Sequence, residues 1–478
     1  MKRGKILLGR RLLAVMLAAA MGVSLTACKG KEDTEGKDAS PKAEAQTPAE
    51  DDASPETEEE SAAKEETRWL LKRSEYYDKT GTMTQYNEYE YNEYGQLTLE
   101  AKGENGEETW RRTYTYDENQ VCNGGTMSRK EVASFYVRTT EGVYTYDDYG
   151  NSSSRHDVET TEYEEGYRYT GGTVEYDTYY FRDASGMSTG WVQVGKNSMS
   201  GDVYDYYVTD EENEETADKE ETYNEDGLLV KLVSGDSVEE YEYDDHGNMT
   251  KKTITRHANS PEEKYSVYYT YSYEEQLCKN VPPAEEPETE EKEVIAKAVT
   301  KDSQGNTLYY YTYAYNQRGE VTLARGFSQG GNFATEYTMY DDQNRVTQVR
   351  SDSMVADKIY DESGLCIREE FREYIDDEEP MIYADCEYDE NGNLLRSVKH
   401  AVKSSYSDAE GSYQTYEYEN DLVKKCSYYS SGGTLESYDE YAYDEEGKIV
   451  TITIYNGDGT VESITTPVYY SISVFPEN

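Results

Sequence analysis

Apolar and aromatic residues alternate with polar ones along most of the chain after residue 68, a pattern typical of strands with two unlike faces. Segments such as "YAY" and "TITIY" place a ring or a branched side chain at every second position. Short stretches rich in Asp, Asn and Gly separate these segments. Beyond the N-terminal region, apolar residues do not recur at helical spacing over any long segment. The pattern therefore predicts a nearly all-β chain built from short antiparallel hairpins.

One unit, Tyr-x-Tyr-Asp/Asn-x-x-Gly-x-apolar, recurs throughout this region. Tyr-x-Tyr places both rings on one face of a strand, because side chains alternate with a period of two. Asp or Asn at the first position and Gly at the fourth fit a four-residue turn in which Gly takes the left-handed conformation, and a second strand follows. Each unit is therefore expected to form one hairpin. Clear copies are "YEYNEYGQL" (89–97), "YEYDDHGNM" (241–249), "YAYNQRGEV" (313–321) and "YAYDEEGKI" (441–449).

The spacing of the units divides the chain. We interpret residues 68–478 as one repeat domain, interrupted in two places. Residues 282–293, "PPAEEPETEEKE", are an acidic, Pro-rich insertion that we interpret as a loop. Residues 150–220 have room for repeats too degenerate to align, and they include Trp191. A repeated hairpin that continues over this length predicts a long curved or coiled sheet, a solenoid-like ribbon with no single central core.

The N-terminal region differs from the rest. Residues 1–27 combine a basic start with the apolar run "LLAVMLAAAMGVSL", which predicts a secretory signal. The run ends in "LTAC", which resembles the lipobox of bacterial lipoproteins. That resemblance implies cleavage before Cys28 and a lipid anchor on its thiol and new N-terminus. An uncleaved anchor and an ordinary signal remain alternatives. Residues 28–67 lack aromatic residues and are rich in Glu and Asp, which predicts a disordered acidic tether.

The repeat units resemble the YD repeats of Rhs-type bacterial surface proteins. Copies such as "YAYDEEGKI" and "CEYDENGNL" (386–394), each followed by a second strand and a Gly turn, carry the likeness over most of residues 74–465. The family implies a long β-ribbon that coils or curls, and carbohydrate binding has been proposed for such repeats. This chain is much shorter than the large members and ends soon after the last repeat, so we expect neither a closed shell nor a toxin role.

The net charge of the chain restricts the kinds of partner that it can bind. The chain has 47 Lys and Arg against 99 Asp and Glu, a formal net charge of −52. A surface of this kind repels nucleic acids, so we expect no nucleic-acid partner. It suits cations or basic partners and keeps an exported monomer soluble. The 52 tyrosines indicate that Tyr forms much of the core, with hydroxyl groups that need partners when buried.

Catalytic and metal motifs do not stand out in the sequence. No nucleophile elbow, zinc-protease helix or phosphate loop is present, so we expect no enzyme and no cofactor. The Asp-x-x-Gly turns lack the spacing of calcium loops, and Asp has a sufficient backbone role there, so we expect no specific metal site. Cys366 and Cys386 lie on the two strands of one expected hairpin, where a disulfide can form. Two free thiols are the alternative.

We predict a lipid-anchored module on the extracytoplasmic face of a bacterial cell envelope that binds glycans or surface proteins, or serves a structural role. Aromatic residues beyond those that the repeat requires are the candidate ligand contacts: Tyr179, Tyr180, Trp191, Tyr206, Tyr207, Tyr310 and Tyr311. Two other functions remain open. One is a solute-binding or carbohydrate-active lipoprotein with a pocket in residues 150–220, and the other is a passive spacer.

Overall fold

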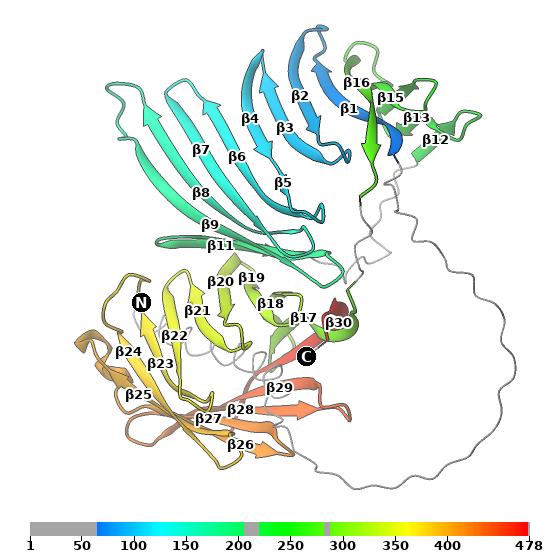
Figure 1. Ribbon diagram of the computed structural model, residues 1–478. Coiled ribbons are helices and arrows are strands. Elements are labelled where there is room, and N and C mark those ends of the chain that lie inside the picture. The colour runs from blue at the N-terminus through cyan, green and yellow to red at the C-terminus, as the bar shows by residue number, and fades with distance from the viewer. Residues whose placement is uncertain (1–64, 205–218, 282–286, 477–478) are drawn as a thin grey trace, which may run out of the picture.

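The computed structural model describes residues 65–204, 219–281 and 287–476. In these residues the chain is all-β and antiparallel, as the alternation predicts, with one short 3-10 helix, η1 (Ser404–Ala409). The strands form two bodies, an open sheet and a closed barrel (Figure 1). No described helix has the length and apolar character needed to cross a bilayer. Cys28, the signal segment, most of the tether and Tyr206 and Tyr207 lie outside the described residues.

The open sheet contains the first sixteen strands. They are β1 (Glu65–Tyr77), β2 (Met83–Tyr91), β3 (Leu97–Glu104), β4 (Glu107–Thr113), β5 (Thr115–Tyr116), β6 (Cys122–Val132), β7 (Tyr136–Tyr146), β8 (Ser152–Tyr163), β9 (Gly172–Arg182), β10 (Ser188–Gly195), β11 (Ser198–Val203), β12 (Lys219–Tyr223), β13 (Leu229–Ser234), β14 (Ser237–Tyr243), β15 (Met249–Arg256) and β16 (Tyr265–Lys279). Strand β1 pairs with both β2 and β16, which joins two meanders into one sheet with β11 and β12 at its edges.

The barrel contains the other fourteen strands. They are β17 (Glu290–Asp302), β18 (Thr307–Tyr315), β19 (Val321–Ser328), β20 (Gly331–Tyr340), β21 (Val346–Ser351), β22 (Met354–Tyr360), β23 (Cys366–Arg372), β24 (Ile382–Tyr388), β25 (Leu394–Ala401), β26 (Tyr413–Glu419), β27 (Leu422–Tyr429), β28 (Leu435–Tyr443), β29 (Ile449–Asn456) and β30 (Val461–Val474). Residues 290–293 of the expected insertion loop belong to β17, and 282–286 lie outside the described residues.

Closure of the barrel corrects the expectation of a solenoid-like ribbon. Strand β17 pairs antiparallel with β30 from Glu290 opposite Val474 to Asp302 opposite Ser463. Closure pairs the backbone groups that two free edge strands would expose, and it encloses the tyrosine side of the meander. The repeated hairpin therefore builds two shapes in one chain, an open sheet before residue 280 and a barrel after residue 289.

The turn predicted for the repeat is present in most of its copies. In the copy at 441–449, the Oδ1 atom of Asp444 accepts hydrogen bonds from the backbone N–H groups of Glu446 and Lys448, each at 2.9 Å. Gly447 has φ of +82°, where a side chain would be strained. The same pair of bonds to the i+2 and i+4 amides recurs at Asp78, Asn92, Asp117, Asp147, Asn224, Asp244, Asp302, Asn316, Asp341, Asp361 and Asp389. Glu445 and Glu446 are exposed turn residues.

The second Tyr of most units links neighbouring repeats. Its hydroxyl donates to a backbone carbonyl at the start of a strand in the neighbouring unit; Tyr443 donates to the Val423 carbonyl at 2.8 Å. This contact explains why the position is Tyr rather than Phe, since the ring fills the interior and the hydroxyl satisfies a main-chain group. The same bond is made by Tyr91, Tyr116, Tyr243, Tyr315, Tyr340, Tyr360, Tyr388, Tyr418 and Tyr469.

Replacement of Tyr443 by Phe tests this link. We expect a loss of about 1 kcal/mol in the free energy of unfolding, because the ring stays packed while the Val423 carbonyl loses its donor. Urea unfolding measures the change. Tyr374→Phe is the control, since Tyr374 is 45 % exposed in the loop between β23 and β24. An equal effect at both positions would contradict a specific role for the hydroxyl.

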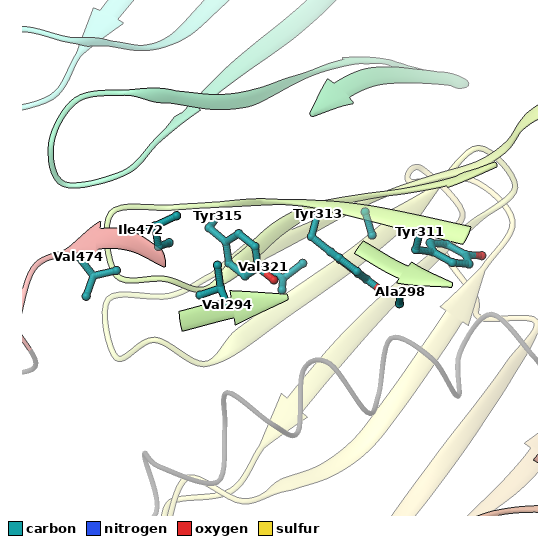
Figure 2. Close-up of a cluster of buried hydrophobic side chains, with 9 residues drawn as sticks. Val294, Ala298, Tyr311, Tyr313, Tyr315, Val321, Ile472 and Val474 are labelled. Atoms are coloured by element: carbon teal, nitrogen blue, oxygen red, sulfur yellow. The ribbon is translucent and has the colours of Figure 1, made fainter. Parts of the chain in front are cut away.

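Tyrosines line the inside of the barrel. Tyr311, Tyr313 and Tyr315 of β18 alternate along one strand face and pack with Val294 of β17 and Ile472 of β30 (Figure 2). The three rings are 2–3 % exposed. The prediction that the tyrosine face forms the core is confirmed for this part of the barrel.

The outer face of β18 to β20 packs against the end of the open sheet. Ala314, Leu323 and Tyr337 of the barrel form one buried cluster with Phe181 and Val192 of the sheet. Polar contacts reinforce it. The Thr189 hydroxyl donates to the Tyr315 carbonyl at 2.8 Å, and the Gln317 amide donates to Asp147 at 2.9 Å. The region predicted as degenerate repeats therefore includes the strands that hold the two bodies together.

Candidate functional site

Five aromatic side chains gather at the far ends of β6 to β9. Strands β6 and β7 meet at residues 133–135, and β8 and β9 are connected by residues 164–171. We call the group formed by Phe135, Tyr136, Tyr163, Tyr167 and Tyr169 the aromatic tip. The Asp147 turn, at the opposite end of β7 and β8, contacts the barrel. Since these strands are 11 or 12 residues long, the aromatic tip projects about 35 Å beyond that contact (Figure 1).

The rings of the aromatic tip are stacked in a column. Tyr167 lies between Phe135, with centroids 4.9 Å apart and an interplanar angle of 13°, and Tyr163, at 5.4 Å and 4°. Tyr169 tilts against both tyrosines at 5.8 Å. Backbone bonds fix the two loops together, since the Glu164 N–H donates to the Phe135 carbonyl at 3.1 Å. The column is therefore held in place before any ligand arrives.

These rings remain accessible although they contact one another. Phe135 is 39 % exposed, Tyr167 37 % and Tyr169 51 %. An exposed aromatic cluster at the end of a rigid element is the usual character of an interaction surface. Arg168 lies over the Tyr169 ring, 4.7 Å from its centroid. The nearby loop is acidic, with exposed Glu164 and Glu165, so the surface disfavours polyanions.

The predicted contact residues within the described part of the chain do not form one site. Tyr180 and Trp191 are directly opposite each other on β9 and β10, and Tyr179 faces the other side of the sheet, stacked on Tyr337 at 5.1 Å. Tyr310 points out of the barrel and stacks on Phe327 at 5.1 Å, with the Lys297 ammonium 4.0 Å from its centroid. Tyr311 is buried in the barrel wall. Of the predicted contact residues that the structure describes, it brings together only Tyr180 and Trp191.

Sequence reasoning missed the aromatic tip because its members stand outside the repeat motif and far apart in the chain. Phe135 is separated from Tyr167 by a complete strand pair. A local signal was present: "YEEGYRYTGG" (163–172) puts three tyrosines around a Gly turn within the degenerate region.

A cavity of about 320 Å³ lies between the two bodies. Tyr179 and Asp177 of β9 line one side, and Tyr337, Gln348 and Arg350 of the barrel line the other. Arg350 also donates to the carbonyls of Gly195 and Lys196, which ties it to the β10–β11 turn. This cavity is lined in part by residues 150–220, the region in which the solute-binding alternative places its pocket.

A second cavity, of about 510 Å³, lies inside the barrel. Strands β21 to β27 line it, together with the turn residues 343–345, 363–365 and 391–393, so it reaches the rim of the barrel. Polar groups face inward here: Lys358 is paired with Glu369 across β22 and β23, and Ser397, Lys399 and Gln414 lie nearby. Cys366 and Cys386 also line this cavity, both as free thiols.

Comparison with known proteins adds little. No family model and no curated protein matches the chain. One solved structure, a porin-like protein from Bacteroides uniformis, matches over 72 % of this chain and 95 % of its own at 10 % sequence identity, with a TM-score of 0.17. Among the described residues, no group of three or more His, Cys, Asp or Glu side chains is arranged to hold a metal ion.

Proposed function

We propose that this chain is a non-enzymatic binding module of the bacterial cell envelope that holds a neutral glycan at the aromatic tip. The observation that carries the proposal is the column of Phe135, Tyr167 and Tyr163 at the end of a projecting sheet, with Phe135 and Tyr167 exposed. Aromatic faces and edges pack on the C–H surfaces of sugars, and neighbouring carboxylates accept hydrogen bonds from sugar hydroxyls. Because the rings are already stacked, binding costs little side-chain entropy.

The negative charge of the chain indicates which class of glycan the aromatic tip can bind. A chain with a net charge of −52 and exposed glutamates beside the rings disfavours acidic polysaccharides and anionic lipid. A neutral, hydroxyl-rich surface avoids this repulsion. The repeated hairpins supply a stiff support for the rings, in line with the resemblance to YD-repeat surface proteins.

The proposed location depends on the N-terminal segment. Lipidation at Cys28 would anchor the chain, and residues 28–67 would separate the sheet and barrel from the membrane. The outward face of the barrel carries charged groups: Arg368 and Asp385 form a 2.8 Å ion pair there, with both side chains about 40 % exposed. Such groups are costly against lipid. We therefore assign membrane attachment to Cys28 and expect a monomer on the extracytoplasmic face.

A glycan array with the purified chain tests the proposal. We expect binding to one or more neutral glycans, and a loss of about 2 kcal/mol, roughly thirtyfold in Kd, when Tyr167 is replaced by Ala. Tyr167 is the middle ring of the column, so its removal separates Phe135 from Tyr163. Tyr374→Ala is the matched control, because Tyr374 has similar exposure and lies on the barrel.

Three outcomes would redirect the proposal. Binding that survives Tyr167→Ala but is lost on changing Tyr179 or Arg350 would favour the solute pocket between sheet and barrel. Turnover of a bound glycan would favour a carbohydrate-active enzyme. An array with no binding, together with no captured envelope protein, would favour the passive spacer.

A further inference from the structure

The barrel cavity contains a pair of cysteines whose placement depends on the repeat. Each repeat hairpin has a bulge in which the second Tyr pairs with the first residue of the next strand: Ile359 is opposite Arg368, whereas Tyr360 is opposite Cys366. Ile367 has no partner residue in this ladder, and its side chain is 43 % exposed on the outer face. Without this bulge, Cys366 would share the outward face of Arg368. With it, the Cys366 side chain turns into the barrel.

Cys386 meets Cys366 across the next strand pair. The β23–β24 ladder ends with Arg368 opposite Asp385, and Cys386 comes one residue later, facing inward opposite Ser397 of β25. The Cys366 thiol donates to the Arg368 carbonyl at 3.5 Å, and the Cys386 side chain lies close enough to change the pKa of Cys366. They are half-buried and line the cavity, whereas Cys278 and Cys426 are at most 2 % exposed. The pair is therefore both close enough to react together and open to a small molecule.

The surroundings of the cysteine pair favour a thiolate on Cys366. The interaction with the Cys386 side chain and the nearby Lys358 ammonium lower the pKa of Cys366, while that same interaction and burial raise the pKa of Cys386. Lys358 and Lys399 both act on Glu369, so two ammonium groups face one carboxylate in this part of the cavity. A low-pKa thiolate beside a resolving thiol is the arrangement that thiol–disulfide exchange requires.

We propose that Cys366 and Cys386 form a reversible thiol–disulfide exchange site for small disulfides that carry carboxylate groups. The cavity of about 510 Å³ has room for such a molecule, and Lys358 and Lys399 match its negative charge. This proposal is independent of glycan binding at the aromatic tip.

The thiol–disulfide exchange takes place in two steps. The Cys366 thiolate attacks one sulfur of R–S–S–R′, which forms a Cys366–S–S–R mixed disulfide and releases R′S⁻. Cys386 then attacks the Cys366 sulfur, closes the Cys366–Cys386 disulfide and releases RS⁻. The protons of the two thiols pass to the released thiolates. Two electrons thus move from the cysteine pair to the small disulfide, and excess small thiol reverses both steps.

Trapping of the intermediate tests this site. In the Cys386→Ser chain, incubation with cystine should leave a half-cystine on Cys366, which mass spectrometry detects as a stable adduct. In the unaltered chain the same treatment should give a Cys366–Cys386 disulfide that excess cysteine reduces. At neutral pH, iodoacetamide should modify Cys366 at least about tenfold faster than Cys122.

Cys122 is the matched control. It pairs with Tyr116 as Cys366 pairs with Tyr360, so it occupies the same repeat position and is likewise partly exposed, but none of the other described cysteines faces it. An adduct on Cys366 that forms no faster than one on Cys122 would overturn the proposal. A Cys366–Cys386 disulfide that excess cysteine cannot reduce would also overturn it and would indicate a structural cross-link.

Discussion

Replacement of Glu336 by Gln is expected to stabilise the chain at pH 8 and to change its stability little near pH 4. Glu336 is 8 % exposed on the inner wall of β20, beside the rings of Tyr311 and Tyr313, and its Oε2 atom has no hydrogen-bond partner. Burial raises the pKa of this carboxyl to about 8. Gln has nearly the same shape and carries no charge at any pH.

The direction of this pH dependence of stability follows from proton binding to Glu336. Below the usual pKa of about 4.5, both the folded and the unfolded chain keep the Glu336 proton, so no penalty arises. Between pH 4.5 and 8 the unfolded chain releases that proton while the folded chain retains it, so stability falls as pH rises. The difference between Gln and Glu chains should reach on the order of 4 kcal/mol at pH 8.

Urea unfolding of both chains at pH 4.5 and pH 8 measures this difference. Glu446→Gln is the control, since Glu446 is an exposed turn residue. A gain from Glu336→Gln that is equal at the two pH values would show that the Glu336 carboxyl is not neutral in the folded barrel.

Removal of the Lys358 ammonium is expected to cost about 3 kcal/mol, because Glu369 would keep a charge in the barrel interior without its closest partner. The two side chains are 20 % and 15 % exposed and are paired across β22 and β23. The charge of Glu369 raises the pKa of Lys358 against the opposing effect of burial. Replacing both residues, Lys358→Met with Glu369→Leu, should recover most of the loss, since no uncompensated charge remains.

A double-mutant cycle in urea isolates the pair. Lys424 and Glu419 supply the matched control: they form a 2.7 Å ion pair, but their side chains are 57 % and 62 % exposed. Lys424→Ala should change stability by less than about 0.5 kcal/mol. Equal costs for the two lysines would indicate that water reaches the Lys358 pair freely.

The repeat could be predicted from the sequence in detail, because its determinants are local. The Tyr-x-Tyr spacing fixes which face Tyr441 and Tyr443 share, and both belong to one core cluster. Asp444 and Gly447 form the expected turn. The repeat motif did not predict the turns at Asp183 and Asp302, because Arg182 and Lys301 stand where the repeat has Tyr.

Closure and the aromatic tip could not be predicted, because both depend on pairs far apart in the chain. The strand that pairs with β17 is β30, and nothing in either segment specifies the other. The bulge beside Tyr360 shifts the register by one residue, so that Cys366, rather than Ile367, stands opposite the Tyr. The aromatic tip combines two loops from separate hairpins. Each of these features follows from pairing, which a local pattern does not encode.

Hydrogen–deuterium exchange with and without a glycan identified on the array tests the central claim most directly. The account predicts slower exchange on binding at residues 133–136 and 163–169, with an intact glycan recovered afterwards. Unchanged exchange at these residues, protection confined to the barrel, or a cleaved glycan would contradict it.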